Sequence, residues 1–124
     1  MMSVNEFTAD MLNDLLSAFN RHDLDGVMQH FAENAIMVAA SGANGNGQVI
    51  EGADAIRGFF AKRFESLADM RWTSVAEFVS GDRAVTEWRV QSPSAGIDAL
   101  GCDLWTFRDG KVLVKDTYLK QVAA

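Results

Sequence analysis

Asp103 is the residue in this sequence whose setting best suits acid–base chemistry. It alternates with Trp105 and Phe107 along a run typical of a β-strand, so the three side chains should share one apolar side. Desolvation there would favour the neutral form of the carboxyl group. We therefore expect Asp103 to act as a general acid or as a hydrogen-bond donor toward a bound molecule.

A buried ion pair with Lys115 is the alternative interpretation of Asp103. If Arg108-Asp109-Gly110 forms a three-residue hairpin loop, Lys115 lies opposite Asp103. A two-residue Asp109-Gly110 turn would place Asp116 there instead, which brings two carboxylates together. Both roles are compatible, because a desolvated lysine beside a carboxylate is also an acid–base pair. The same register decides whether Tyr118 faces the pocket or the outer side of the sheet.

Aromatic residues dominate the side of the strands that carries Asp103. All three tryptophans fall on this side, and helical residues and one residue of an early strand can join them. We expect these side chains to line a cavity for a small apolar molecule, the alternative being that they fill the interior. They are Phe19, Met37, Phe59, Phe60, Trp72, Trp88 and Trp105.

The remaining chemically active side chains favour no metal or cofactor site. His22, in a turn, and His30, on the polar side of a short helix, are expected to be solvated. Cys102 points away from Asp103 and is expected to serve in packing. Two histidines and one cysteine are too few for a zinc site, so we expect no metal and no cofactor.

Composition limits the class of protein further. With 124 residues, 48% of them hydrophobic, and one proline, the chain should form one domain over residues 1–124 with a true core. Eleven basic and 17 acidic residues give a net charge of −6 without a basic cluster. This excludes the usual charge pattern of nucleic-acid and anionic-membrane binders. No apolar run reaches 18 residues, so we expect a soluble, cytoplasmic domain.

Helical patterns occupy the first half of the chain. Ser3 and Glu6 form a capping-box pattern, and an apolar stripe at helical spacing follows it. Asp23 is the expected N-cap of a second, short helix, and a third helix is predicted over residues 53–64. The glycine-rich segment 41–48 is either a lid over the pocket or an ordinary connection.

Strand patterns follow the helices. Alternating residues predict long antiparallel strands that twist around the helices, in an α+β fold. The fold should therefore be a cone that is apolar inside and ringed by loops at its mouth. The predicted strands are 35–40, 70–79, 83–90, 97–107 and 111–122.

Four segments carry a resemblance to a known family: His22-Asp23-Leu24-Asp25-Gly26, Phe31-Ala32-Glu33-Asn34-Ala35, Gly52 to Phe60, and Asp103 to Val112. These segments, and the order of the helices and strands around them, resemble the nuclear transport factor 2-like (NTF2-like) superfamily, and in particular its SnoaL-like branch, which includes polyketide cyclases and ketosteroid isomerases. The resemblance implies a cone in which three N-terminal helices pack into a strongly curved, mostly antiparallel sheet.

The resemblance also implies positions for the groups of the ketosteroid isomerase mechanism, which uses an aspartate base and an oxyanion hole of a tyrosine and a protonated aspartate. The oxyanion tyrosine falls on Leu15, the base falls on Ala39, and a supporting tyrosine falls on Phe60. Only the oxyanion aspartate, at Asp103, is kept. We therefore do not expect steroid isomerisation by that mechanism, and we expect Leu15, Ala39 and Phe60 to line an apolar pocket.

Three classes of function remain open at this stage. The first is an isomerase, cyclase or lyase that uses Asp103, with Lys115, on a small hydrophobic metabolite. The second is a non-catalytic binder of such a molecule. The third is a structural or interaction module whose interior is filled and which acts through the outer face of the sheet. The resemblance implies a homodimer, for which Val75, Val79 and Val85 on that face are the candidate contacts.

Overall fold

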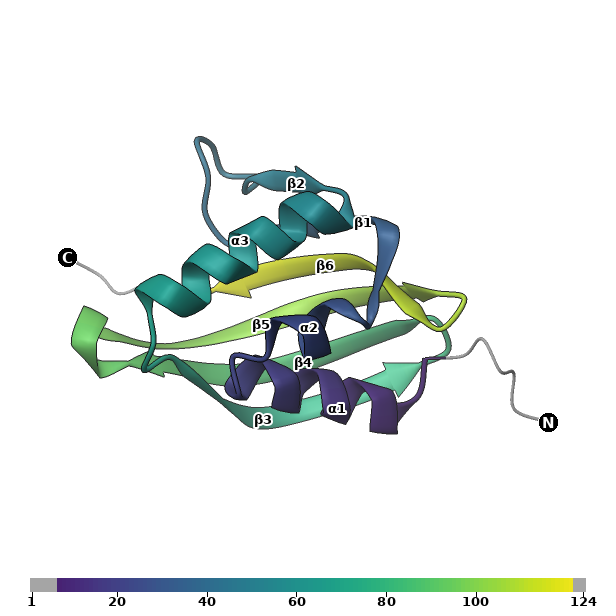
Figure 1. The fold of residues 1–124 in the computed structure, drawn as a ribbon. Helices are drawn as coiled ribbons and strands as arrows, with labels where there is room; N and C mark the ends of the chain where they lie inside the picture. Colours follow the sequence, from purple (N-terminus) through teal and green to yellow (C-terminus); the bar gives the residue numbers. More distant parts are fainter. Residues whose placement is uncertain (1–6, 122–124) are drawn as a thin grey trace.

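The computed structural model describes residues 7–121, which form three α-helices and six strands (Figure 1). The Ser3–Glu6 capping pattern lies outside the described residues. The elements are α1 (Ala9–Asn20), α2 (Leu24–Met28), β1 (Phe31–Val38), β2 (Val49–Glu51), α3 (Ala53–Ser66), β3 (Arg71–Ser80), β4 (Arg83–Ser92), a short 3-10 helix η1 (Pro93–Ala95), β5 (Ile97–Arg108) and β6 (Lys111–Leu119).

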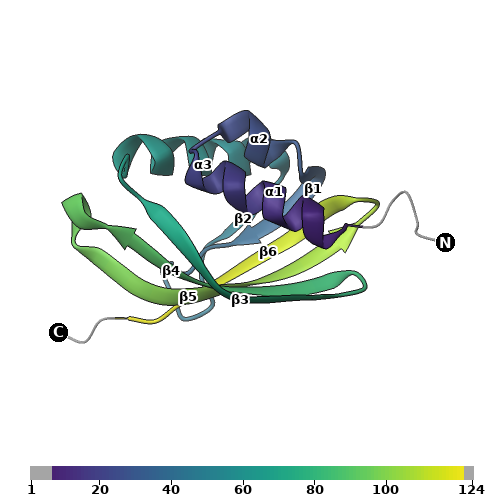
Figure 2. The same cartoon turned by 90° about the horizontal axis from the view of Figure 1, so that it is seen from below.

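The strands form one sheet in the order β2-β1-β6-β5-β4-β3. Among the strands of residues 7–121, only β1 and β6 pair in parallel, and all other neighbours are antiparallel. Figure 2 shows that the sheet is curved and that the three helices lie on the same face of it. The expected α+β fold, with three helices packed on a curved, mostly antiparallel sheet, is therefore confirmed, and the sheet does not close on itself.

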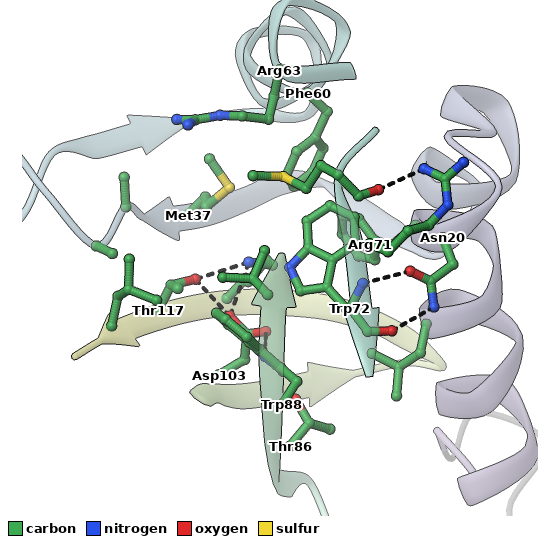
Figure 3. A pocket seen from close by; sticks show the side chains of 18 of the residues that line it. Asn20, Met37, Phe60, Arg63, Arg71, Trp72, Thr86, Trp88, Asp103 and Thr117 are labelled. Carbon is green, nitrogen blue, oxygen red and sulfur yellow. Dashed lines mark hydrogen bonds and ion pairs between the residues drawn. The ribbon is translucent and has the colours of Figure 1, made fainter. Parts of the chain in front are cut away.

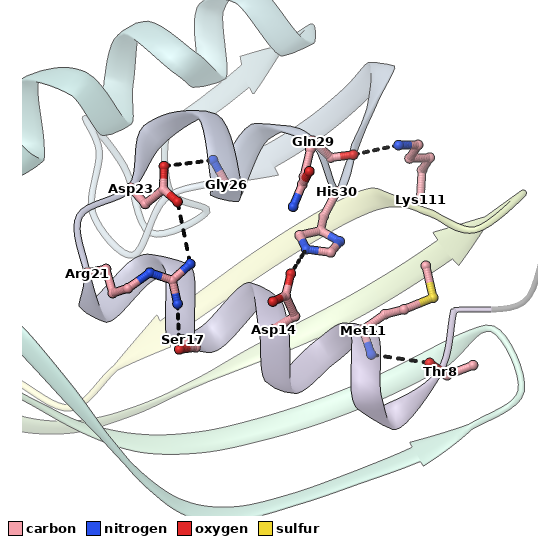
Figure 4. A network of polar contacts seen from close by, with 10 residues as sticks. All are labelled: Thr8, Met11, Asp14, Ser17, Arg21, Asp23, Gly26, Gln29, His30 and Lys111. Atoms are coloured by element: carbon pink, nitrogen blue, oxygen red, sulfur yellow. Dashed lines mark hydrogen bonds and ion pairs between the residues drawn. The ribbon is translucent and has the colours of Figure 1, made fainter.

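Local sequence signals explain where several elements begin and turn. Thr8 caps α1 by accepting a hydrogen bond from the Met11 amide, and Asp23 caps α2 in the same way through the Gly26 amide (Figure 4). The β5–β6 hairpin has a two-residue turn, with φ values of 52° at Asp109 and 74° at Gly110. These left-handed values are those of the turn type that matches the twist of a hairpin.

The core lies between the helices and the concave face of the sheet. Leu12 and Leu15 of α1, Val27 of α2, Trp105 of β5 and Val112 of β6 are at most 1% exposed. Burial of this apolar surface is the main force that holds the helices on the sheet. No helix within residues 7–121 has the length and hydropathy to span a bilayer.

A one-residue bulge in β6 sets the register opposite Asp103. Phe107 pairs with Val112, but Thr106 pairs with Val114, so Leu113 has no partner on β5. Asp103 consequently lies opposite Thr117, and both predicted registers are wrong. Beyond the bulge the alternation along β6 is reversed, so that Lys115 and Thr117 share the face of Asp103, and the turn alone does not reveal this.

A second bulge, at Val75 in β3, changes the predicted outer face. Ser74 pairs with Trp88, whereas Ala76 pairs with Glu87, so the alternation reverses beyond Val75. Val79 therefore packs against the core, and its predicted place on the outer face is wrong. Phe78 takes that place and is 64% exposed. The homodimer itself stays a prediction.

His30 is buried, contrary to the expectation that it is solvated. It is 8% exposed, and its Nε2 lies 2.8 Å from Asp14 Oδ2 (Figure 4). The ring also packs edge-on against Phe7, with centroids 5.9 Å apart. His30 thus links α1 to the segment between α2 and β1. It is not among the residues that line the pocket described below.

Asp69 ties the start of β3 to the turn after β4. Its carboxylate accepts hydrogen bonds from the Ser92 hydroxyl and from both the amide and the hydroxyl of Ser94. These bonds lower the pKa of Asp69 from its ordinary 3.8 to about 2, with the Ser92 hydroxyl as the largest cause. The ionised form is therefore the one that the fold stabilises.

Replacement of Asp69 by asparagine should reduce stability in a pH-dependent way. Because the pKa of Asp69 is lower in the folded protein, its contribution is complete above about pH 4 and is lost as the pH falls towards 2. The difference in unfolding free energy between the wild type and Asp69→Asn should thus shrink over that range. Urea unfolding from pH 2 to pH 7 measures it, and a difference independent of pH would contradict this role.

Candidate functional site

A cavity of about 740 Å³ lies between the concave face of the sheet and helices α1 and α3. Its size is within the range of small-molecule sites in proteins. Strands β1, β3, β4, β5 and β6 all contribute to its wall, and the segment before β2 contributes at the mouth. Figure 3 shows the side chains that meet there.

One side of the cavity is aromatic. The Phe19 ring lies edge-on to Phe60 at 5.1 Å between centroids and edge-on to Trp72 at 5.8 Å. These contacts bring α1, α3 and β3 together over the cavity, and they are the geometries that aromatic pairs prefer. Phe19, Phe60 and Trp72 therefore form one apolar side of the cavity.

The inner wall holds one polar cluster, centred on Asp103. Its Oδ1 accepts hydrogen bonds from Lys115 Nζ at 2.9 Å and from Thr117 Oγ1 at 2.6 Å, and its Oδ2 accepts one from Trp88 Nε1 at 2.9 Å. Three donors directed at two oxygens fit an ionised carboxylate, which only accepts. The expected role of Asp103 as a neutral donor does not agree with this geometry. The alternative, a buried ion pair with Lys115, is what the structure contains.

Lys115 presents its ammonium group to the cavity from within this cluster. Its side chain is 11% exposed, against 5% for that of Asp103. Beyond Asp103, Nζ donates to Thr117 Oγ1 and lies 5.7 Å from the ring centroids of Phe19 and Trp105 and 5.9 Å from that of Phe60. Ring faces attract a cation at this range. The charge of Lys115 is thus stabilised on several sides.

Trp88 reaches Asp103 because the residue opposite it is glycine. Trp88 pairs with Gly101 across β4 and β5, and its ring lies directly over the glycine. A Cβ atom at Gly101 would lie 2.5 Å from Cη2 of Trp88 and 2.8 Å from the Tyr118 carbonyl oxygen. The missing side chain therefore lets Trp88 lie flat against β5 with its N–H on the carboxylate.

Trp72 is positioned by the end of α1. The Asn20 side chain donates to the Trp72 carbonyl and accepts from the Trp72 amide, each at 2.8 Å (Figure 3). The amide group thus pairs with β3 as a neighbouring strand would, at the edge of the sheet. This fixes Trp72, which is half-buried, at the border of the cavity.

The glycine-rich segment 41–48 closes tightly at its base, beside the mouth of the cavity. Ala39, Ser41 and Gln48 line the mouth, and the Gln48 carbonyl accepts from the Ala39 amide at 2.9 Å. Gly47 has φ of 81°, and a Cβ there would lie 2.3 Å from the Ala39 carbonyl oxygen. The glycines serve this close backbone approach. A lid role stays a prediction.

Nine of the predicted site residues line the cavity, and three do not. Those that line it are Phe19, Met37, Ala39, Phe59, Phe60, Trp72, Trp88, Asp103 and Lys115. Leu15 and Trp105 are fully buried in the core, and the Trp105 indole donates to Thr86 Oγ1. Tyr118 is 57% exposed on the outer face, because it lies opposite Cys102 rather than Asp103. The predicted place of Leu15 in the pocket is therefore wrong, Trp105 fills the interior as the alternative had it, and Tyr118 takes the outer of the two positions left open for it.

Sequence reasoning missed several polar residues of the site. Thr117 shares its face of β6 with Lys115, and Thr86 shares its face of β4 with Trp88, so alternation alone could have indicated both. Arg63 follows Phe59 and Phe60 by four and three residues, which places it on their face of α3. Asn20 gave no comparable signal. Among residues 7–121, no group of three or more His, Cys, Asp or Glu side chains is placed to hold a metal ion.

Cys102 lies on the outer face, half-buried, and takes no part in the cavity. Burial raises the pKa of its thiol, and the nearby carboxylates of Asp103, Glu87 and Asp116 raise it further. The thiol is thus the stable form, as expected for a residue used in packing.

Comparison with known proteins supports the fold. The sequence profile of the SnoaL-like domain family matches residues 12–114. An NTF2-like protein of unknown function from Mesorhizobium loti is similar in structure, with a TM-score of 0.81, 23% identity, and coverage of 91% of this chain and 90% of that one. A SnoaL-like protein of unknown function from Burkholderia thailandensis gives a TM-score of 0.78 at 16% identity, covering 90% of this chain and 93% of that one.

A protein described as a candidate polyketide cyclase, from Sinorhizobium meliloti, has the same fold. Its TM-score is 0.75 at 19% identity, with coverage of 89% of this chain and 94% of that chain. At such identities the likeness establishes the fold alone, since one fold carries many functions. No curated protein matches the chain significantly in sequence.

Proposed function

Because the chain belongs to the SnoaL-like domain family, we propose that its cavity binds a small, apolar, ring-containing molecule with an oxygen atom at one end. The observation that carries this proposal is the combination of an aromatic cavity of about 740 Å³ with a single polar cluster on its inner wall. Pockets of this kind obtain affinity from apolar contact and orientation from a few polar groups.

Lys115 is the group that would orient the ligand. An ammonium group has three N–H donors, and two of them bond to Asp103 and Thr117. The third can donate to a carbonyl or hydroxyl oxygen of a ligand in the cavity. Asp103 already accepts three hydrogen bonds, so its part is to hold Lys115 and Trp88 in place.

The polar cluster around Asp103 favours a binding function over proton-transfer chemistry. Lys115, the acid of the inner wall, and Asp103, the base, are paired with each other. Each is therefore held by the other rather than available to exchange a proton with a substrate. A catalytic function, as an isomerase, cyclase or lyase, remains a second candidate because the Lys115 ammonium faces the cavity. There it would stabilise negative charge that develops on a substrate oxygen.

Filling the cavity should abolish binding of a suitable probe. The probe is 2-naphthamide, a neutral two-ring molecule with a carbonyl oxygen, measured by titration calorimetry. Ala39→Trp adds a large side chain at the mouth of the cavity, so we expect at least tenfold weaker binding, which is ~1.4 kcal/mol. Ala43→Trp, in the exposed loop and outside the cavity lining, is the matched control and should bind like the wild type.

Two results would count against the proposed function. Equal affinity in Ala39→Trp and Ala43→Trp would show that the probe binds elsewhere. Absence of binding to the wild type would contradict a pocket for ring-containing molecules. Circular dichroism of both variants verifies that each has folded.

A further inference from the structure

The charge around the cavity is opposite to the charge of the chain. The whole chain carries 11 basic and 17 acidic residues. The residues that line the cavity include four basic side chains, of Arg21, Arg63, Arg71 and Lys115, and only two acidic ones, of Asp103 and Glu87. An acidic protein thus has a locally basic pocket, which favours an anionic ligand.

Two of these four cations already have a carboxylate partner. Lys115 pairs with Asp103, and Arg21 lies 3.4 Å from Asp23. Among residues 7–121, no carboxylate pairs with Arg63 or Arg71. Arg71 donates to the backbone carbonyls of Met70 and Ala68, which leaves Arg63 as the more available group.

Arg63 is placed to contact the part of a ligand that extends beyond the aromatic side chains of the cavity. It extends from α3 on the same face as Phe59 and Phe60, and its Cζ lies 5.1 Å from the centroid of the Phe59 ring. Figure 3 shows its side chain at the α3 side of the pocket. A guanidinium group stacked on a ring keeps its edge donors free, in the planar arrangement that suits a carboxylate.

We propose that the ligand is an apolar carboxylate, whose rings lie among the aromatic side chains and whose carboxylate pairs with Arg63 at the mouth. This inference rests on the proposed function, since it specifies the chemical class of the molecule in the same cavity. The other end of the ligand contacts the Asp103–Lys115 pair, whose two charges balance each other. Because Asp103 already balances the charge of Lys115, the inner end of the ligand needs no charge of its own and should be an uncharged oxygen-bearing group.

Two probes of one shape test the charge preference. 2-Naphthoate and 2-naphthamide differ mainly in the charge of the group attached to the ring. We expect the wild type to bind the naphthoate about tenfold more tightly, the value of one charge-assisted hydrogen bond. In Arg63→Gln the ratio of the two affinities should fall to about one, because the neutral amide cannot neutralise the carboxylate.

Lys62→Gln is the matched control. It removes the same charge from the neighbouring position of α3, and Lys62 is exposed and outside the cavity lining. The ratio should stay at its wild-type value there, and Arg63→Lys should keep part of the preference. A ratio unchanged in Arg63→Gln, or a wild type that prefers the amide, would overturn the proposal while leaving the pocket itself supported. If neither probe binds the wild type, both this inference and the proposed function fail.

Discussion

Replacement of Lys115 by methionine should lower the unfolding free energy by about 3 kcal/mol, the usual loss when one partner of a buried ion pair is removed. The substitution keeps much of the side-chain volume but leaves the Asp103 carboxylate, 4% exposed, without its counter-charge. Thr117 and Trp88 would still donate to Asp103, so the loss comes from the missing charge. Urea unfolding followed by circular dichroism measures it.

Two controls separate charge from packing in this experiment. Lys62→Met, on the exposed side of α3, should change stability by no more than about 0.5 kcal/mol. The double variant Asp103→Asn/Lys115→Met removes both charges and should be more stable than Lys115→Met alone. If Lys115→Met proves as stable as Lys62→Met, the pair is not the buried electrostatic unit described above.

Gly101→Ala should destabilise the protein by about 2 kcal/mol, which is typical of overpacking in a well-filled interior. The new methyl group would overlap the Trp88 ring and the backbone oxygen of Tyr118, and the backbone cannot move aside as a flexible side chain can. Displacement of Trp88 would also break its hydrogen bond to Asp103. We therefore expect weaker binding of 2-naphthamide together with the loss of stability.

The same substitution at another glycine should have the opposite effect. Gly58 lies inside α3, and no atom lies within 4 Å of the position that its Cβ would take. Gly58→Ala should stabilise the protein by about 0.5–1 kcal/mol, because alanine is the better helix former. Equal effects of the two substitutions on thermal unfolding would show that Gly101 has no special packing role.

Side-chain alternation predicted the face of the sheet that carries the site. Asp103, Trp88 and Trp72 all lie on the concave face, because strands keep a period of two residues as long as pairing is regular. The Asp103–Lys115 pair was also among the predictions, and it forms although Thr117 lies directly opposite Asp103. A diagonal neighbour on the same face is still within reach of a long side chain.

The errors arose where a single residue interrupts the pairing. The bulge at Leu113 decides what lies opposite Asp103 and turns Tyr118 outward, and the bulge at Val75 brings Val79 inside. A bulge is a property of two strands together, so the sequence of one strand does not reveal it. This limit explains most of the corrections to the strands.

The division between core and pocket could not be predicted either. Leu15 and Trp105 face the interior as expected, yet they are fully packed, while Trp72 and Trp88 border the cavity. Which interior side chains border the cavity depends on the distance between the sheet and helices α1 and α3. Side-chain alternation within a strand carries no information about the distance between helix and sheet.

The measurement that tests the central claim most directly is a nuclear magnetic resonance titration of the three tryptophan indole N–H signals with 2-naphthamide. Trp72 and Trp88 line the cavity, whereas Trp105 is 0% exposed and is not among the residues that line it. We predict that the signals of Trp72 and Trp88 shift in a saturable way and that the signal of Trp105 shifts much less. Saturable binding that leaves Trp72 and Trp88 unshifted would place the molecule elsewhere and contradict the account of the cavity as the binding site.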